Sequence, residues 1–220
     1  MSSNGAATPI DAVIFDCDGV LVESETIAAR VWVEMANELG YPLPYETAVR
    51  EFKGGEMAWC VAWLERKMNT SVPTGFVPDF RARSAVRFKT ELNPVPGIYA
   101  VLEGLEIPFC VASNGPRDKM AVSLLVTGLA HLFEGRIVSA YEVGVFKPAP
   151  DLFLEAARVL GVAPQSCAVV EDSLPGIRAG VAAQMRVFAY SAPEDFAAHR
   201  EEGATPFGAM SELPDLLGAA

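Results

Sequence analysis

The sequence predicts an α/β protein: a doubly wound, Rossmann-like parallel sheet with a helical bundle inserted after its first strand. From position 94 onward, short apolar runs alternate with helical segments of ten to fifteen residues, which is typical of right-handed βαβ units. Between positions 23 and 92, the periodic stretches all have helical spacing and no strand-like run occurs. We therefore expect an α/β core of residues 1–22 plus 93–220, and a four-helix cap of residues 23–92.

The first expected strand carries Val13, Ile14 and Phe15, an apolar run typical of a strand buried on both faces. It stops at Asp16 and Asp18, which stand one residue apart and precede a glycine. Two neighbouring carboxylates repel each other unless a cation lies between them or one holds a proton. The stretch therefore indicates a metal site, acid–base chemistry or both, and the plain alternative is a helix-capping Asp followed by an Asp-Gly turn.

Helical spacing then predicts the cap. Ser24 is the expected N-cap of a first helix that ends at Gly40. Three further helices follow, at 44–52, 57–68 and 80–92. The sequence Lys53-Gly54-Gly55 separates the helix 44–52 from the helix 57–68. Hinges are expected at 20–22 and 93–94, where the cap leaves the core. Trp59 and Trp63 are expected in the core of the cap, with a hydrophobic surface patch as the alternative.

The remaining elements of the core follow in alternation, and polar residues come directly after several strands. The expected helices are 98–105, 117–126, 151–160 and 175–183, and the expected strands are 108–112, 137–138, 168–170 and 186–190. The second strand ends in Ser113-Asn114, a loop leads to Lys147-Pro148, and the strand 168–170 ends in Glu171-Asp172. A polar, proline-containing tail completes the chain.

Composition excludes several classes of partner. The formal net charge is −11 and there is no basic run, which argues against binding to nucleic acid or to an anionic membrane. Residues 24–92 hold nine basic and nine acidic residues, so the acidic excess lies outside the cap. No apolar stretch approaches ~18 residues, and residues 1–9 lack the apolar core of a signal peptide. We expect a cytoplasmic protein.

The four cysteines are scattered and show no zinc-like spacing. Cys17, Cys110 and Cys167 lie in or beside apolar runs, so we expect small buried hydrophobic side chains rather than metal ligands. This use of cysteine suits a reducing compartment.

The polar groups at the strand ends should meet, because the carboxyl ends of parallel strands open on one side of a sheet. They are Asp16 and Asp18, Ser113 and Asn114, Lys147, and Glu171 and Asp172. Carboxylates of this kind suit Mg²⁺ that also contacts phosphate oxygens, and a lysine offers a point charge to phosphate. An aspartate beside a metal and a lysine can act as a nucleophile, while a second aspartate exchanges a proton with the leaving alcohol.

These motifs, D-x-D-G-V, S-N, K-P and E-D in that order, resemble the four motifs of the haloacid dehalogenase superfamily. The likeness covers almost the whole chain, because the helical insert resembles the cap placed between the first two motifs. Within the superfamily the chain resembles the phosphatase and β-phosphoglucomutase branch. The run from Asp16 to Glu25, with Ser113-Asn114-Gly115-Pro116, is most like bacterial sugar-phosphate phosphatases of the 6-phosphogluconate type.

The resemblance implies a role for each motif residue. Asp16 is then the nucleophile and a Mg²⁺ ligand, and Asp18 is the general acid and base whose main-chain carbonyl also contacts the metal. Ser113 and Lys147 hold the transferring phosphoryl group, with Asn114 nearby. Asp172 ligates Mg²⁺ directly, and Glu171 does so directly or through water. Lys53 and Gly54 belong to a loop that resembles the specificity loop of these enzymes and are expected to bind substrate.

Several branches of the superfamily remain to be weighed. The dehalogenases lack the second aspartate of the first motif, so Asp18 favours phosphoryl chemistry. Phosphonatases use a cap lysine to form a Schiff base, and Lys53 is the nearest candidate. We interpret Lys53 instead as a charge that grips substrate, against the alternative of a solvated loop lysine. β-Phosphoglucomutases carry a histidine ten residues beyond the acid–base aspartate, where this chain has Ala28.

The absence of that histidine favours plain hydrolysis, since both histidines, His131 and His199, lie outside the cap and are expected at the surface or at helix ends. A β-phosphoglucomutase-type isomerase stays the main alternative. A phosphorylatable receiver-like switch and an inactive binding protein on the same fold are weaker alternatives. The expected partner is a small phosphorylated metabolite whose identity the cap leaves open. A monomer is expected, and a dimer is not excluded.

Overall fold

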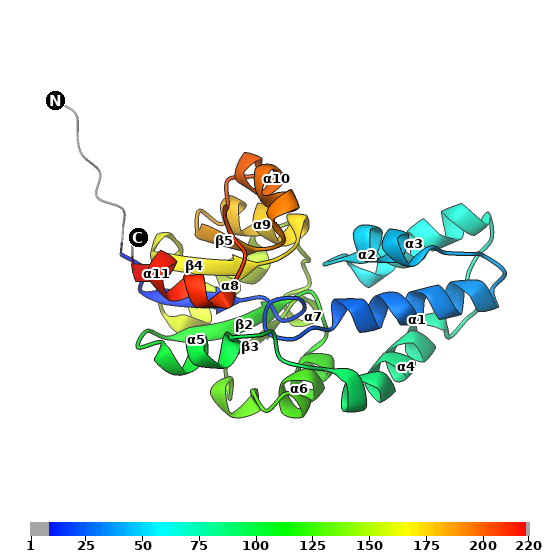
Figure 1. The fold of residues 1–220 in the computed structure, drawn as a ribbon, viewed down its shortest axis with the longest axis horizontal. Coiled ribbons are helices and arrows are strands. Elements are labelled where there is room, and N and C mark those ends of the chain that lie inside the picture. Colours follow the sequence, from blue (N-terminus) through cyan, green and yellow to red (C-terminus); the bar gives the residue numbers. More distant parts are fainter. Residues whose placement is uncertain (1–8, 219–220) are drawn as a thin grey trace.

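The structure, a computed structural model, describes residues 9–218. Its centre is a six-stranded, all-parallel sheet in the order β3-β2-β1-β4-β5-β6, which confirms the predicted fold class (Figure 1). The strands are β1 (Ala12–Phe15), β2 (Phe109–Ser113), β3 (Ile137–Ser139), β4 (Cys167–Glu171), β5 (Arg186–Tyr190) and β6 (Thr205–Phe207). The order reverses between β1 and β4, and ligands of open α/β sheets bind at such a switch point.

Strand β1 lies in the middle of the sheet, between β2 and β4, and all four of its residues are fully buried. Its alternating side chains point to opposite faces. Val13 and Phe15 join the apolar cluster on one face, and Ala12 and Ile14 join the cluster on the other. A strand that is covered on both faces has apolar residues at successive positions, which is why this apolar run predicted a buried strand.

Helices cover both faces of the sheet. Side chains of α5 (Ile98–Gly104), α6 (Arg117–Val126) and α11 (Leu213–Gly218) pack in the cluster that contains Phe15. Side chains of α8 (Asp151–Leu160) and α9 (Leu174–Ala182) pack in the cluster that contains Ile14. The short helices α7 (Ala140–Val143) and α10 (Phe196–Glu201) follow β3 and β5, and 3₁₀ turns lie at Ala130–Leu132, Pro164–Ser166, Pro193–Asp195 and Met210–Glu212.

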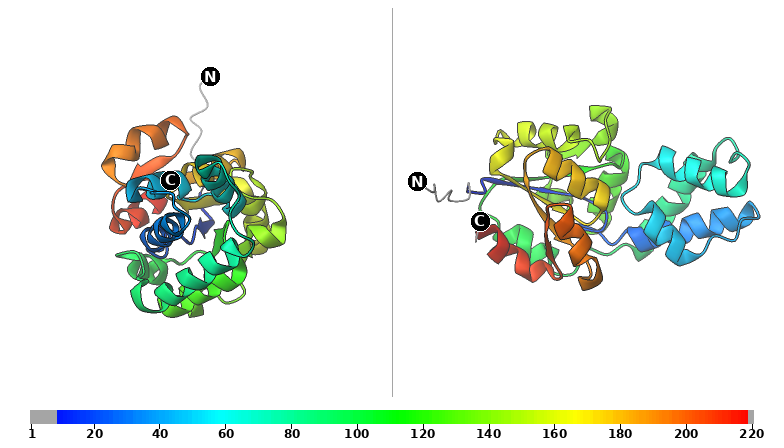
Figure 2. Two further views of the ribbon diagram at one scale, coloured as in Figure 1. Left: turned by 90° about the vertical axis from the view of Figure 1, so that its right-hand side faces the viewer. Right: turned by 90° about the horizontal axis from the view of Figure 1, so that it is seen from above.

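The four expected helices of the inserted segment are present as α1 (Glu25–Glu38), α2 (Tyr45–Phe52), α3 (Met57–Met68) and α4 (Phe76–Glu91). They form a separate group beyond one end of the sheet (Figures 1 and 2). Their own apolar cluster is built around Trp32, whose ring centroid lies 4.7 Å from that of Phe52 and 4.6 Å from that of Phe80. We call α1 to α4 the cap and keep 23–92 as its proposed extent.

The two chain segments that join cap and core run side by side. The backbone N–H of Glu23 donates to the carbonyl of Asn93 at 2.9 Å, and the N–H of Val95 donates to the carbonyl of Leu21 at 3.0 Å. The residues expected as hinges therefore lie in one narrow neck, where few main-chain torsions would need to change for the cap to move.

Some expectations at the level of single residues are wrong. Trp63 is buried against Phe52, as predicted, but Trp59 lies on the outer side of α3 with 44% of its surface exposed. The two tryptophans lie four positions apart on one side of the same helix, yet the second is covered and the first is not. The last cap helix also begins earlier than expected, at Phe76.

The expected polar tail is likewise wrong, because residues after Tyr190 complete the sheet and cover it. β6 pairs with β5 at the edge, and Phe207 and Leu213 are buried. Pro206 lies within β6, and a proline is tolerated only in such an edge strand. His199, expected at the surface or at a helix end, lies in the last turn of α10 but is buried, with its Nδ1 3.0 Å from the Ser191 hydroxyl.

The expectation for the cysteines is confirmed: Cys17, Cys110 and Cys167 are fully buried, and all four cysteines are free thiols. Among residues 9–218, no helix combines the length and the apolar composition needed to cross a membrane. The segment used to judge a signal peptide, residues 1–9, falls almost wholly outside the described residues.

Candidate active site

The site lies at the carboxyl ends of the central strands, and the register of the sheet brings its residues together. Phe15 of β1 is level with Val111 of β2 and with Val170 of β4. The next position on β1 is Asp16, so this aspartate emerges beside the ends of both neighbouring strands. Its side chain is buried although it follows the last residue of the strand. Residues distant in sequence thus share one edge, as expected for a parallel sheet.

Lys147 links two of the strand ends by charge. Its Nζ lies 2.6 Å from Asp16 Oδ1 and 2.7 Å from Glu171 Oε1, and it also donates to the Ala112 carbonyl at 3.2 Å. Burial opposes the protonated form, but the two carboxylates outweigh this effect and raise the pKa of Lys147 above its usual value. The lysine therefore stays charged in an interior where its side chain is only 2% exposed.

Three carboxylates gather next to this lysine. Oxygen atoms of Asp16, Glu171 and Asp172 all lie within 4.8 Å of one another, and all three residues are buried. Burial raises the pKa of Asp172 to about 7, with the Glu171 charge adding to it and Lys53 opposing it. Burial also raises the pKa of Asp16. The charge of Lys147 opposes this rise, and the charge of Glu171 adds to it. Such a set of hard oxygen donors fits Mg²⁺, which binds through one or two carboxylates and keeps several waters.

Two glycines allow these carboxylates to approach so closely. Gly19 has φ +81°, and a Cβ atom there would lie 2.0 Å from Asp172 Oδ2. A Cβ at Gly176, in the first turn of α9, would lie 1.8 Å from Glu171 Oε1. Any side chain at either position would displace an acid of the cluster, so these positions admit only glycine without rearrangement.

Both carboxylate oxygens of Glu171 accept hydrogen bonds from other groups of the protein. Its Oε2 accepts hydrogen bonds from the N–H groups of Asp172 and Ser173, both at 2.8 Å, and from the Ser173 hydroxyl at 2.9 Å. Its Oε1 accepts from Lys147. With both oxygens engaged, Glu171 fixes the lysine and the turn that carries Asp172, a supporting role typical of carboxylates around a metal.

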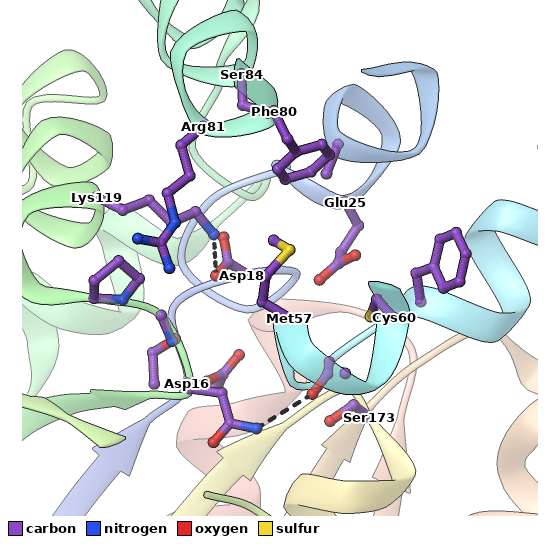
Figure 3. Close-up of a pocket in the computed structure, with 18 of the residues that line it drawn as sticks. Asp16, Asp18, Glu25, Met57, Cys60, Phe80, Arg81, Ser84, Lys119 and Ser173 are labelled. Atoms are coloured by element: carbon purple, nitrogen blue, oxygen red, sulfur yellow. Dashed lines mark hydrogen bonds and ion pairs between the residues drawn. The ribbon is translucent and has the colours of Figure 1, made fainter. Parts of the chain in front are cut away.

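Asp18 stands apart from the three-carboxylate cluster. Its Oδ2 lies 2.6 Å from Lys119 Nζ (Figure 3), and its Oδ1 accepts a hydrogen bond from the Ser24 hydroxyl. Burial alone would raise the pKa of Asp18, but the charge and hydrogen bond of Lys119, together with the Ser24 bond, outweigh it and lower the pKa. Ser24 is the N-cap residue of α1, as predicted, but its side chain makes no capping hydrogen bond and binds Asp18 instead.

Lys119 lines the cavity beside Asp18, and the sequence did not predict it as a residue of the site. It lies in the first turn of α6, which begins at Arg117, directly after the Ser113-Asn114 motif. A cation is disfavoured near the amino end of a helix, where the helix dipole is positive. A lysine at that position is therefore a weak sequence signal for an acidic partner, and here the partner is Asp18.

The loop between α2 and α3 closes on the core. Lys53 Nζ lies 2.9 Å from Asp172 Oδ2. The Asn114 amide donates to the Gly54 carbonyl at 3.4 Å, and its Oδ1 accepts from the Lys147 N–H at 2.9 Å. Asn114 therefore ties the cap loop to the backbone of the central lysine. Gly54 has φ +65° and lies against Ser173, a second place where the cap approaches the core closely.

The cap and core enclose a cavity of about 270 Å³ above these groups (Figure 3). Most of the predicted site residues line it: Asp16, Asp18, Gly54, Ser113, Asn114, Lys147 and Glu171. Lys53 and Asp172 do not form part of its wall and meet beside it. Aromatic side chains of the cap form much of the remaining wall, with Trp32, Phe52 and Phe80 among them.

Comparison with known proteins identifies the family. The family model for haloacid dehalogenase-like hydrolases matches residues 10–184, which include every motif described above. The chain is a haloacid dehalogenase-like hydrolase. A 6-phosphogluconate phosphatase of Escherichia coli K12 is 35% identical over 96% of this chain and 96% of its own length. Hexitol phosphatase A of the same organism is 33% identical, covering 83% of both chains.

A solved structure of the same family matches the chain over nearly its whole length. A haloacid dehalogenase family hydrolase from Deinococcus radiodurans, crystallised with bound phosphate and sodium, superposes with a TM-score of 0.79 at 32% identity. The match covers 96% of each chain, so it includes both the sheet and the cap. The relationship therefore extends over the whole hydrolase, and not over its α/β core alone.

Proposed function

We propose that this protein is a Mg²⁺-dependent phosphatase that hydrolyses a small phosphorylated metabolite, a sugar phosphate, through an aspartyl-phosphate intermediate. The observation that carries the proposal is the buried Asp16 carboxylate, which is held by Lys147 inside a three-carboxylate cluster at the floor of the cavity between cap and core. The relatives named above, which act on phosphorylated sugars and sugar derivatives, favour that substrate class.

The residues of the cluster fit a divalent cation. Asp16 and Asp172 would hold Mg²⁺, with the main-chain carbonyl of Asp18, and Glu171 would act through water because both of its oxygens are engaged. When bound, the ion would offset the negative charge that gathers around the transferring phosphoryl group.

The first half of the proposed reaction is transfer to Asp16. Its carboxylate oxygen bonds to phosphorus while the bond from phosphorus to the sugar oxygen breaks, and Lys147 and Ser113 hold the phosphoryl oxygens. The leaving oxygen takes a proton from Asp18, which faces the cavity, and Lys119 stabilises the Asp18 carboxylate that results. In the second half, Asp18 accepts a proton from a water, which attacks phosphorus and releases phosphate, restoring Asp16.

The alternative isomerase function receives no support from the wall of the cavity. The position where β-phosphoglucomutases carry a histidine is Ala28 on α1, and its methyl group forms part of that wall. His131 and His199 do not line the cavity. A phosphoryl-enzyme without a nearby group that delays the attack of water favours hydrolysis.

The proposal is tested by measuring phosphate release with Mg²⁺ from 6-phosphogluconate, other hexose phosphates, phosphoglycolate and β-glucose 1-phosphate. We expect release from one or a few sugar phosphates, and loss of at least about 100-fold in rate after chelation, with recovery when Mg²⁺ is returned. Glucose 6-phosphate appearing from β-glucose 1-phosphate without free phosphate would establish the isomerase instead. No phosphate from any compound would refute the proposal.

Replacing Lys53 by alanine is expected to raise KM for sugar phosphates by about 10-fold, the cost of losing one charged contact. For p-nitrophenyl phosphate, which lacks the hydroxyls of a sugar, we expect little change. Steady-state kinetics on both substrates checks this, with Lys67→Ala on the neighbouring cap helix as the control. An equal loss on both substrates would assign Lys53 to holding Asp172, which it contacts at 2.9 Å.

A further inference from the structure

One arginine of the cap differs from its neighbours on the same helix. The other two arginines of α4 are each held by acids, Arg83 by Glu38 and Asp79, and Arg87 by Glu34 and Glu91. Arg81 has no acidic partner among residues 9–218, and its side chain extends from α4 into the cavity (Figure 3). Arg81 is exposed to solvent, and a charge that lines a cavity without an acidic partner is a candidate for binding an anion.

The core holds Arg81 in that orientation. Its Nη2 donates to the Tyr141 hydroxyl at 2.8 Å, and its guanidinium carbon lies 5.4 Å from the centroid of that ring. Tyr141, on α7, packs edge-on against Phe146. A guanidinium has five N–H donors in a rigid fork, and the described residues accept from one of its nitrogens only. Arg81 is therefore held in place with its charge unpaired, and most of its N–H donors have no acceptor among the described residues.

A second polar group on the same helix face is also unsatisfied. Ser84 follows Arg81 by three residues, so the two side chains lie on one face of α4. Ser84 lines the cavity and is 6% exposed, and its hydroxyl oxygen has no hydrogen-bond partner within the part of the chain that the structure describes. A buried hydroxyl without a partner costs free energy, which a ligand atom would recover.

The remaining wall of the cavity determines the surroundings of Arg81 and Ser84. Part of the wall near them is aromatic and includes Phe80 of the same helix. The cavity is also lined by two acids outside the motifs, Glu25 and Asp118, and Glu25 interacts chiefly with Asp18, Lys119 and Lys53, on the side of the reacting groups. A cavity of about 270 Å³ admits a single small metabolite.

We propose that Arg81 and Ser84 form a subsite for an oxyanion at the end of the substrate remote from the transferring phosphoryl group. The fork of the guanidinium matches the two oxygens of a carboxylate or of a second phosphate, and the serine hydroxyl supplies one more donor. The preferred substrate is then a phosphorylated sugar acid or a sugar bisphosphate, and not a neutral hexose phosphate. This inference rests on the proposed phosphatase function and narrows its substrate class.

The test compares substrates that differ at the remote end. Steady-state phosphate release is measured on 6-phosphogluconate, fructose 1,6-bisphosphate, glucose 6-phosphate and p-nitrophenyl phosphate. We expect a lower KM for one of the first two than for glucose 6-phosphate, and the better of them identifies the anion as carboxylate or phosphate. Equal KM values for glucose 6-phosphate and both doubly anionic substrates would overturn the inference while leaving the phosphatase function intact.

Variants then assign the effect to the subsite. Arg81→Met is expected to raise KM for the preferred anionic substrate by about 10- to 100-fold, the effect of losing hydrogen bonds to a charged group, and Ser84→Ala by about 3- to 10-fold. Activity on p-nitrophenyl phosphate should change less than about twofold. Arg83→Met, two residues away and paired with acids, is the matched control and should resemble the native protein.

A purely structural role of Arg81 would give a different pattern. If the arginine only fastened the cap to Tyr141, Arg81→Met would impair all substrates equally, and Tyr141→Phe would have the same effect, which would overturn the inference. Binding is followed separately by calorimetry on Asp16→Asn, with and without Arg81→Met. Loss of affinity for the anionic substrate only in the double variant would support the subsite even without turnover, and equal affinities would refute it.

Discussion

Replacing Asp16 by asparagine is expected to lower the rate of phosphate release by at least about 10³-fold, because an amide cannot form the phosphoryl-enzyme. Asparagine has nearly the same shape, so the cavity should keep its walls. The native carboxylate sits in a cluster with excess negative charge, where its neutralisation relieves repulsion from Glu171 and Asp172. Lys147 keeps its bond to Glu171. We therefore expect the fold to survive, with a change in unfolding free energy of about 1 kcal/mol or less.

The measurement pairs phosphate release with thermal unfolding followed by circular dichroism. Asp11→Asn, at the exposed start of the same strand, is the matched control and should keep full activity. A freshly prepared Asp16→Asn protein that turns over at a rate near the native one would rule out Asp16 as the nucleophile. An unfolded variant would show instead that the carboxylate is needed for the fold.

Replacing Lys147 by methionine is expected to damage both stability and activity, and to lower stability more than any other single change in the site. Methionine has a similar length, but it leaves Asp16 and Glu171 without the cation that lies 2.6 Å and 2.7 Å from them. Removing one partner of a buried ion pair costs about 3–5 kcal/mol, because the remaining charges stay in the interior. Phosphate release should fall by at least about 100-fold as well, since the charge that holds the phosphoryl group is gone.

Urea unfolding with and without Mg²⁺ measures the first effect, and Lys89→Met, at an exposed position of α4, controls for the loss of a lysine. The destabilisation should shrink as the pH falls. Unpaired buried carboxylates have folded-state pKa values above their unfolded ones, so protonation favours the folded state at low pH and this contribution is lost as the pH rises. A variant as stable as the native protein at neutral pH would contradict the described ion pairs.

Much of this molecule could be predicted from the order of its residues. The apolar run of β1 predicted a central strand because a strand buried on both faces has no polar positions, and β1 proved fully buried. The meeting of Asp16, Ser113, Lys147 and Glu171 followed from one rule, that parallel strands open at the same edge. The helices 57–68, 117–126 and 151–160 were predicted with their observed ends, because apolar periodicity and terminal glycine or proline residues mark them.

The polar tail was misjudged because β6 is short, lies at the edge of the sheet and contains a proline, so nothing in its local sequence marks a strand. Trp59 was misplaced because periodicity shows which residues share a helix face, but not how far a neighbouring helix covers that face. Both errors have the same origin. Whether a residue at the edge of a sheet or of a helical bundle is buried depends on neighbouring elements that its local sequence does not specify.

Only the tertiary structure decided how the cap meets the core. Lys119 reaches Asp18 across 101 positions of sequence, and Lys53 reaches Asp172 from the other side of the cavity. The Lys119 contact lies within the core, whereas the Lys53 contact depends on the angle at which the neck near Leu21 and Val95 holds the four helices, and no periodic pattern encodes that angle. The sequence by itself therefore determined the fold, the family and the polar residues that gather at the strand ends. The packing of cap on core decided which charges surround those groups and which end of a substrate they face.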